Sequence, residues 1–168
     1  VGKISQREMN LRAAEEAFAC LEGVARLKEE LRKPWNEEHQ NEKRRQLQEP
    51  LGNKMLESVQ SVGDTALTPM AAVAGTIAQL AAEAALAASA SEAIVENGGD
   101  LYVAAPRETR VALYAGHSPI GDSLAFAIPP ERLPLAICSS SSRMGHSLSL
   151  GDCDLATVIA PNASLADA

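Results

Sequence analysis

A chain of 168 residues is long enough for one domain with a buried core. Its formal charge of −7 argues against a nucleic-acid backbone as partner, because such binding needs clustered Lys and Arg. Aromatic residues make up only 3% of the chain, so the core must be built from Ala, Val, Leu and Ile. Three cysteines without a paired framework suit a reducing compartment, and the absence of export features from a sequence beginning at Val1 leads us to expect a cytoplasmic protein.

The N-terminal segment predicts a long helix over residues 5–33. Ser5-Gln-Arg-Glu8 has the form of a capping box, and Pro34 ends the helix. Apolar residues recur at three-or-four spacing on one face, and we interpret this stripe as core packing, with a partner-binding surface as the alternative. The stripe consists of Leu11, Ala14, Phe18, Leu21 and Ala25, joined by Ala17, Val24, Leu27 and Leu31.

A polar loop over residues 35–53 and a short amphipathic helix over 54–62 precede a long Ala-rich helix over 69–88. Thr68-Pro69 is a helix-opening pair, with Thr as cap and Pro at the first helical position. We reject a membrane span here, because Ala is weakly hydrophobic and Gln79 and Glu83 fall inside the run. The free N–H groups of Met70, Ala71 and Ala72 form a potential anion site at the helix start.

From residue 93 to residue 160 the sequence is typical of short strands separated by Gly, Pro and Ser. Helices followed by antiparallel-looking strands predict a single α+β domain over residues 1–168. The expected strands are Ala93–Val95, Leu101–Ala104, Arg110–Ala115, Leu124–Ile128, Ala136–Cys138 and Ala156–Ile159.

The chain is organised around a polar turn from Glu96 to Asp100, which separates two β-prone runs. Gly98-Gly99 exposes main-chain N–H groups that no Cβ shields, so a phosphate or ribose can approach closely. Asn97 can donate and accept, while Glu96 and Asp100 can accept from a ribose hydroxyl or help to hold a cation. A hairpin turn without a ligand explains the same residues, and in isolation it is the commoner case.

A serine-rich loop near the C-terminus is the second candidate for phosphate binding. Its four hydroxyls, from Ser139, Ser140, Ser141 and Ser142, precede Arg143 and His146, and this set can bind a diphosphate. A mobile loop without function is the alternative. A Ser/His/Asp hydrolase ranks lower, because the nucleophile elbow of such enzymes is missing. Asp167 lies in a helix start, where it complements the helix dipole or serves as a metal ligand.

Five blocks, in order, closely resemble an uncharacterised prokaryotic family related to the ApbE flavin transferases. The resemblance covers roughly residues 54–168, and the combination is far more specific than any one block. The blocks are Leu67-Thr-Pro-Met-Ala-Ala-Val-Ala-Gly75, Ile94-Val-Glu-Asn-Gly-Gly-Asp-Leu-Tyr102, Leu113-Tyr-Ala-Gly-His-Ser-Pro119, Met144-Gly-His-Ser-Leu-Ser149 and Val158-Ile-Ala-Pro-Asn-Ala-Ser-Leu-Ala-Asp-Ala168.

The resemblance implies a duplicated α+β unit of the T-fold type, with long helices packed on antiparallel sheet. ApbE proteins bind FAD and, with Mg²⁺, cleave its diphosphate to attach FMN to a Thr or Ser of a partner protein. By this resemblance residues 97–100 lie at the flavin site, residues 139–142 correspond to a Thr-Ser-Gly loop, His146 is the candidate acid or base, and Asp167 is the magnesium ligand. Two departures weigh against transfer: Ser147-Leu-Ser-Leu-Gly151 replaces Asp-Pro-x-Thr-Gly, and Pro69-Met-Ala-Ala72 replaces a Lys-Gly helix opening.

The sequence therefore leads to two hypotheses. In the first, the Gly-Gly turn, the helix start at Pro69 and the serine-rich loop converge on a phosphate-bearing nucleotide such as FAD or FMN, with Mg²⁺ held partly by Asp167. Whether the protein then acts as an enzyme or only binds is left open. In the second, the protein is a catalytically silent scaffold, in which either long helix supports a homodimer.

Overall fold

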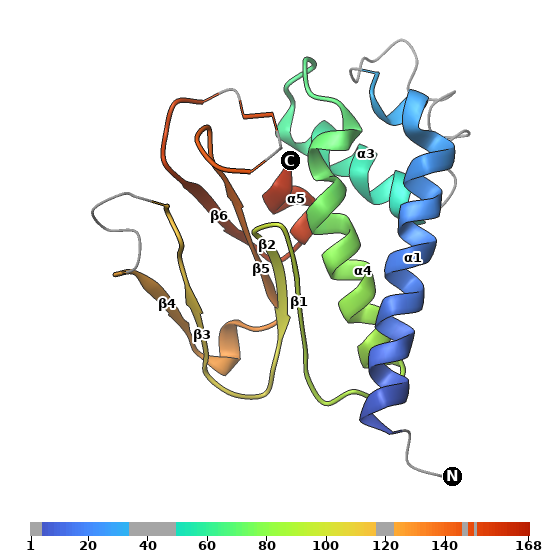
Figure 1. The fold of residues 1–168 in the computed structure, drawn as a ribbon, viewed down its shortest axis with the longest axis vertical. Helices are drawn as coiled ribbons and strands as arrows, with labels where there is room; N and C mark the ends of the chain where they lie inside the picture. Colours follow the sequence, from blue (N-terminus) through green and yellow to red (C-terminus); the bar gives the residue numbers. More distant parts are fainter. Residues whose placement is uncertain (1–4, 34–49, 117–122, 146–147, 150) are drawn as a thin grey trace.

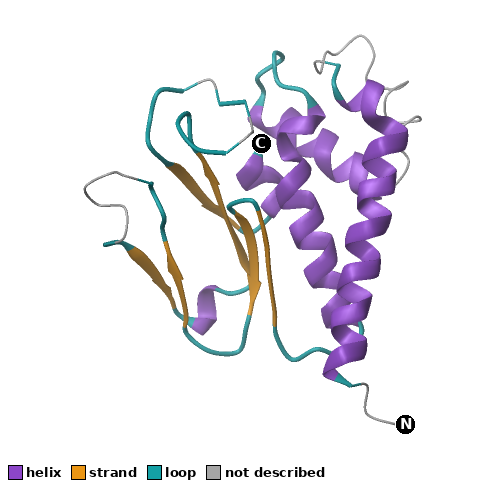
Figure 2. Cartoon of the chain, in the orientation of Figure 1, coloured by secondary structure: helices purple, strands orange, loops and turns teal. Residues whose placement is uncertain are grey.

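Helices cover one face of an antiparallel sheet, and a separate strand pair lies on the sheet's other side (Figures 1 and 2). The computed structural model describes residues 5–33, 50–116, 123–145, 148–149 and 151–168. Across Figure 1, helix α1 stands outermost, α4 lies between α1 and the sheet, and the small α5 is wedged beside α4. The fold is thus a mixed α+β arrangement with antiparallel sheets, as the sequence predicts.

Each helix begins where the local sequence dictates. Helix α1 spans Gln6–Leu31, and the Ser5 side chain accepts a hydrogen bond from the Glu8 N–H at its start. Helix α3 spans Pro50–Val62, so it starts four residues before the predicted position, with a proline in its first turn. A 3₁₀ turn over Pro69–Ala72 leads into α4, Val73–Ala87, and the predicted cap is wrong, because the Thr68 side chain makes no capping hydrogen bond. Asn162 caps α5, Ala163–Asp167, by accepting from the Leu165 N–H at 3.2 Å.

The main sheet has four strands in the order β1-β2-β5-β6, each antiparallel to its neighbour. Their bounds are Ala93–Asn97, Asp100–Ala104, Leu135–Ser140 and Ala156–Ala160. A second, two-stranded sheet pairs β3, Thr109–Ala112, with β4, Ala125–Ile128. Residues Pro130–Arg132 form a single 3₁₀ turn before β5.

Three apolar clusters hold these layers together, and all rely on small or aliphatic residues. The first joins α1, α3 and the start of α4, with Leu31, Met55 and Val59 fully buried. The second packs Ala-rich α4 and α5 onto the sheet. The third lies between the sheet and the β3–β4 pair, around Val103 and Ile137. Because Ala side chains are short, α4 can lie close to both the sheet and α1.

The segment Pro69–Ala87 is the one described helix long and apolar enough to cross a membrane by length and composition. Slightly more than half of its most apolar window, 56%, is buried within the protein itself. It packs between α1 and the sheet, as a core helix does (Figure 1). The helix is therefore not a clear membrane span.

Helix α1 corrects part of the expectation that its apolar stripe packs into the core. Leu11, Phe18 and Leu21 are 56%, 69% and 53% exposed. The rest of the predicted stripe does face inward: Leu31 is buried, and Ala17, Val24 and Leu27 are partly buried beside it, together with Cys20. Helix α1 is apolar on two faces, so a three-or-four spacing alone cannot tell which face turns inward.

Candidate functional site

The turn between β1 and β2 is a two-residue hairpin loop made of Gly98 and Gly99. Their φ angles are +69° and +106°, which L side chains rarely adopt, so the sequence needs glycine at both positions. Asn97 and Asp100 flank the loop as the last register pair of the two strands. The Glu96 carboxylate accepts a hydrogen bond of 2.7 Å from the Gly99 N–H, which fixes the loop. The segment is therefore a hairpin turn, and it lies at one end of the sheet.

This turn contacts two segments that are distant from it in the sequence. The Asn97 side-chain amide donates to the Ala74 carbonyl, near the start of α4, at 3.2 Å. The Ser139 N–H donates to the Gly99 carbonyl, also at 3.2 Å, where β5 ends. A Cβ on Gly99 would lie 3.3 Å from the Ser139 carbonyl oxygen, so the close approach itself favours glycine. The start of α4, the Gly-Gly turn and the end of β5 thus meet.

Helix α5 joins the same place through Asp167. The Asp167 carboxylate accepts a hydrogen bond of 2.8 Å from the Gly75 N–H. A Cβ on Gly75 would lie 2.4 Å from the Ala163 carbonyl oxygen, so α5 can dock here only against a glycine. Buried hydrogen bonds lock the contact, with the Gln79 side chain accepting from the Ala163 N–H at 2.9 Å. We call the place where the turn, the α4 start, the β5 end and α5 meet the junction.

The negative charges of two carboxyl groups in the junction, Asp100 and Asp167, are only partly stabilised by their surroundings. Burial raises the pKa of Asp100 to about 6, against hydrogen bonds from the Cys138 thiol and the Ser139 N–H that lower it. Burial, followed by the charge of Asp100, raises the pKa of Asp167 to about 7, although N–H groups of Gly75 and Ala74 donate to it. None of the ion pairs formed among the described residues includes either carboxylate.

Cys138 is the neutral member of this group. Its thiol is buried and lies 3.6 Å from the Ala163 carbonyl. Burial, together with the negative charges of Asp100 and Asp167, raises the pKa of the thiol, so Cys138 stays protonated and donates. The sequence showed Cys138 only as a core or loop thiol, because its neighbours come from other segments. Gly75 and Ala74 were missed for the same reason.

A bound divalent cation would compensate the carboxyl pair, since carboxylate oxygens are preferred ligands of Mg²⁺. Among the described residues, however, no group of three or more His, Cys, Asp or Glu is arranged to hold a metal ion. A cation at Asp167 would therefore complete its shell with waters and with oxygens of a bound phosphate, as is usual for Mg²⁺. The donor set fits magnesium bound together with a ligand rather than a closed protein cage.

The predicted anion site at the start of the Ala-rich helix is arranged differently from the expectation. Ala71 donates its N–H to the Thr68 carbonyl at 2.9 Å, within the 3₁₀ turn. Ala72 is fully buried, and Met70 packs against the first apolar cluster. Contact with the Gly-Gly turn and with Asp167 is made by the next residues of the chain, Ala74 and Gly75.

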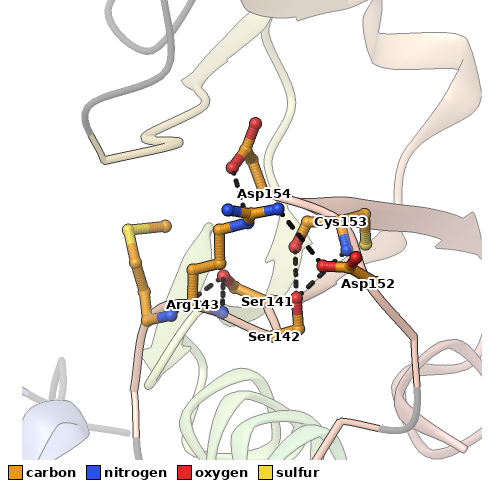
Figure 3. A network of polar contacts seen from close by, with 7 residues as sticks. Ser141, Ser142, Arg143, Asp152, Cys153 and Asp154 are labelled. Carbon is orange, nitrogen blue, oxygen red and sulfur yellow. Dashed lines mark hydrogen bonds and ion pairs between the residues drawn. The ribbon is translucent and has the colours of Figure 1, made fainter.

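The serine-rich loop beyond β5 satisfies most of its own polar groups (Figure 3). The Ser141 hydroxyl accepts from the N–H groups of Arg143 and Met144, at 3.0 Å each. The Ser142 hydroxyl donates to the Cys153 carbonyl and accepts from the Cys153 N–H, at 2.9 Å and 3.1 Å. Of the other two hydroxyls, that of Ser139 pairs with Thr157 at 3.0 Å. Ser140 is exposed at the end of β5.

Arg143 is neutralised within the same loop. Its guanidinium lies 3.2 Å from the Asp152 carboxylate and 3.1 Å from that of Asp154 (Figure 3). A diphosphate would have to displace these carboxylates before it could bind the arginine. His146, the predicted acid or base, lies outside the described residues, so its role stays a prediction.

Two hollows on the described surface lie along α1, not at the junction. One is lined by α1 and by Ala84, Ala87 and Ala88 of α4, and the other by α1 and the start of β1. Neither includes the Gly-Gly turn or Asp167. The junction is thus a meeting of segments at the end of the sheet, and the concave pocket expected there is not one of these hollows.

The fold and the junction define an α+β protein with a candidate ligand site where a glycine turn, a helix start, one buried and one half-buried carboxyl group meet. The chain belongs to the family described as AbpE bacteria, which matches residues 2–168.

Archaeal proteins are among its relatives. A UPF0280 protein of Methanosphaerula palustris is 43% identical over 108 residues, which are 64% of this chain and 46% of the relative. A UPF0280 protein of Archaeoglobus fulgidus is 46% identical over 116 residues, covering 69% and 46%. One from Methanospirillum hungatei is 48% identical over 100 residues, covering 60% and 41%. The chain thus spans less than half the length of the curated relatives it matches.

Proposed function

We propose that this protein is an ApbE-like protein that binds a flavin nucleotide, or a related phosphate-bearing nucleotide, together with Mg²⁺ at the junction. The observation that carries the proposal is the meeting of the Gly98–Gly99 turn with the buried carboxyl group of Asp100 and the half-buried one of Asp167, neither of which has a cationic partner among the described residues. The proposal includes the duplicated T-fold arrangement and residence in the cytoplasm, where the thiols of the three cysteines remain reduced.

Each part of the junction has a role in this proposal. The glycine turn allows a phosphate or ribose to approach the backbone without meeting a Cβ. Asp167 holds the cation, and its elevated pKa means that binding the cation releases a proton near neutral pH. Asp100 adds negative charge beside it, which strengthens cation binding. When bound, Mg²⁺ would neutralise the oxygens of a diphosphate.

Binding is tested by calorimetric titration of FAD, FMN and ADP, each with and without Mg²⁺. We expect magnesium-dependent binding of at least one of these nucleotides, weakened at least about tenfold by Asp167→Asn, since a charge-assisted contact is worth roughly 1.5–3 kcal/mol. Glu131→Gln is the matched control, because this exposed carboxylate sits on the 3₁₀ turn before β5. The proposal would be contradicted if the nucleotide affinity changed neither on removal of Mg²⁺ nor in Asp167→Asn, or if none of the three nucleotides bound.

A second candidate, a catalytically silent protein that keeps the fold, is favoured by one observation. Ser141, Ser142 and Arg143 already bond within their own loop, in the region where Ser147-Leu-Ser-Leu-Gly151 departs from the transferase pattern. The two candidates differ in one measurable reaction, the release of AMP from FAD as FMN is transferred to a hydroxyl. Magnesium-dependent AMP release that is lost in His146→Ala and Asp167→Ala would establish the enzyme. FAD binding without AMP release would establish a nucleotide-binding protein that does not transfer FMN, and the absence of both binding and release would favour the silent scaffold.

A further inference from the structure

The outer face of α1 carries a row of apolar side chains that the fold does not use. The row comprises Leu11, Ala14, Phe18, Leu21 and Ala25, which we call the outer stripe, and all five are exposed. Their spacing is alternately three and four residues. This is the spacing of the a and d positions along which two helices pack side by side.

The stripe is not a displaced core face, because α1 already has one. Its inner face packs on α3 and α4 through Cys20 and Leu31, with Ala17, Val24 and Leu27 partly buried. Phe18 is 69% exposed, an unusual position for an aromatic side chain with no contact to cover it in the described part of the protein. A second apolar face on a helix that is already docked is typical of a surface for another helix.

A row of glutamates, which we call the acidic column, runs beside the outer stripe and favours a positively charged partner for this surface. Glu8, Glu15, Glu22 and Glu29 follow at intervals of seven residues, and all four are exposed. With Leu11 and Phe18 as a positions, these glutamates occupy successive e positions, which flank the seam and select partners by charge. Arg12 offsets part of this charge by pairing with Glu15 at 3.2 Å.

A second copy of the chain fits this surface poorly in either direction. In an antiparallel pair the e positions of the two helices face each other, so glutamate would meet glutamate along the seam. In a parallel pair the d positions meet, which would bring Arg7 and Lys28 against their own copies at the two ends of the seam. A helix with Lys or Arg beside its apolar seam would avoid the repulsion between glutamates, and its positive charges would attract the acidic column.

We propose that the outer stripe docks an amphipathic helix of a different protein, about three heptads long, whose apolar seam is flanked by Lys or Arg. Phe18 and Leu21 would be its central anchors, since buried aromatic and aliphatic side chains near the middle of an interface dominate binding. The acidic column would set orientation and association rate. This surface is independent of the junction and of any nucleotide.

The test uses two synthetic helical peptides of three heptads with the same Leu seam, one flanked by Lys and one by Glu. Fluorescence anisotropy with the full chain should show binding of the Lys peptide and at least about tenfold weaker binding of the Glu peptide. Phe18→Gln should lower the affinity for the Lys peptide at least about tenfold. Tyr114→Gln, an equally exposed aromatic at the end of β3, should leave binding unchanged.

Charge reversal separates docking from general attraction to an acidic protein. The triple variant Glu15→Lys, Glu22→Lys, Glu29→Lys should exchange the preference, so that the Glu peptide binds better than the Lys peptide. Glu57→Lys, on the exposed side of α3, should change neither affinity beyond salt-dependent screening. Far-UV circular dichroism checks that each variant is folded.

Four outcomes would overturn the proposal. Equal binding of both peptides, or Lys-peptide binding that survives Phe18→Gln, would reduce the effect to non-specific attraction. No binding of either peptide would show that the stripe is not a helix-docking surface. A dimer in sedimentation experiments that Phe18→Gln dissociates would assign the stripe to a second copy.

Discussion

The junction and the serine-rich loop were both predicted to bind phosphate, and they differ in how their polar groups are satisfied. In the junction, the contacts join segments far apart in sequence, such as Gly75 with Asp167 and Asn97 with Ala74, and two carboxyl groups remain without a counter-charge. In the loop, Ser142 and Arg143 bond to residues about ten positions away, and the charge of Arg143 is met by two carboxylates. A site prepared for a ligand has polar or charged groups that the protein itself leaves without partners, and among the described residues of these two regions the carboxyl groups of the junction are such groups.

The largest effect that separates the two regions should come from Gly75→Ala. The new Cβ would lie 2.4 Å from the Ala163 carbonyl oxygen and 2.9 Å from the Asp167 Cβ, so α5 must move. We expect a loss of roughly 2–4 kcal/mol in the free energy of unfolding, measured by urea denaturation. Gly151→Ala, in the loop region, is the control, because nothing lies within 4 Å of its added Cβ. Equal costs for the two variants would show that α5 does not dock against Gly75.

A second test uses the pH dependence of stability without added metal. Burial raises the pKa of Asp100 to about 6 and that of Asp167 to about 7 in the folded state, above the ordinary value of 3.8. Between about pH 4 and pH 7 the folded state therefore holds protons that the unfolded state has lost, and the free energy of unfolding falls as pH rises. Below pH 4 both states are protonated, and the difference vanishes.

Asp167→Asn removes much of this dependence. We expect the free energy of unfolding of the variant to rise by roughly 1–3 kcal/mol relative to that of the wild type as the pH goes from 4 to 8. Urea denaturation at several pH values in this range measures the difference. Asp152→Asn, whose carboxylate is 90% exposed in the loop, should follow the wild-type curve within about 0.5 kcal/mol. A wild-type stability that rises through this window would contradict the assignment of raised pKa values to the pair.

The smallest effect is expected in the loop itself. Ser142→Ala removes a hydroxyl that bonds to both the N–H and the carbonyl of Cys153. We expect a cost of about 1 kcal/mol or less, because the loop is exposed and water can replace the lost bonds. Calorimetry should show no change in nucleotide affinity. A large loss of nucleotide affinity in Ser142→Ala would show that the loop takes part in ligand binding.

The sequence was most informative where one residue type has a strong local preference. Gly98-Gly99 between two β-prone runs predicted the turn, Thr68-Pro69 predicted the helix start, and Ser5 predicted the first cap. The inward face of α1 could not be predicted, because the helix is apolar on two sides and tertiary packing decides between them.

The junction was visible from the sequence only in part. Asn97, Asp100 and Asp167 could be singled out by residue type, but their connection through Ala74, Gly75 and Cys138 depends on contacts between distant segments. For the loop, four serines and an arginine predicted groups available to a ligand. The sequence does not show that Ser141, Ser142 and Arg143 already bond within the loop.

The most direct test replaces Mg²⁺ by paramagnetic Mn²⁺ and follows the backbone amide signals by NMR in the presence of ADP. Substoichiometric Mn²⁺ should broaden the amides of Gly75, Gly99 and Ser139 first, because they surround Asp100 and Asp167. Broadening that instead begins at Asp152 and Asp154 would place the cation in the serine-rich loop, and the account of the junction would be wrong.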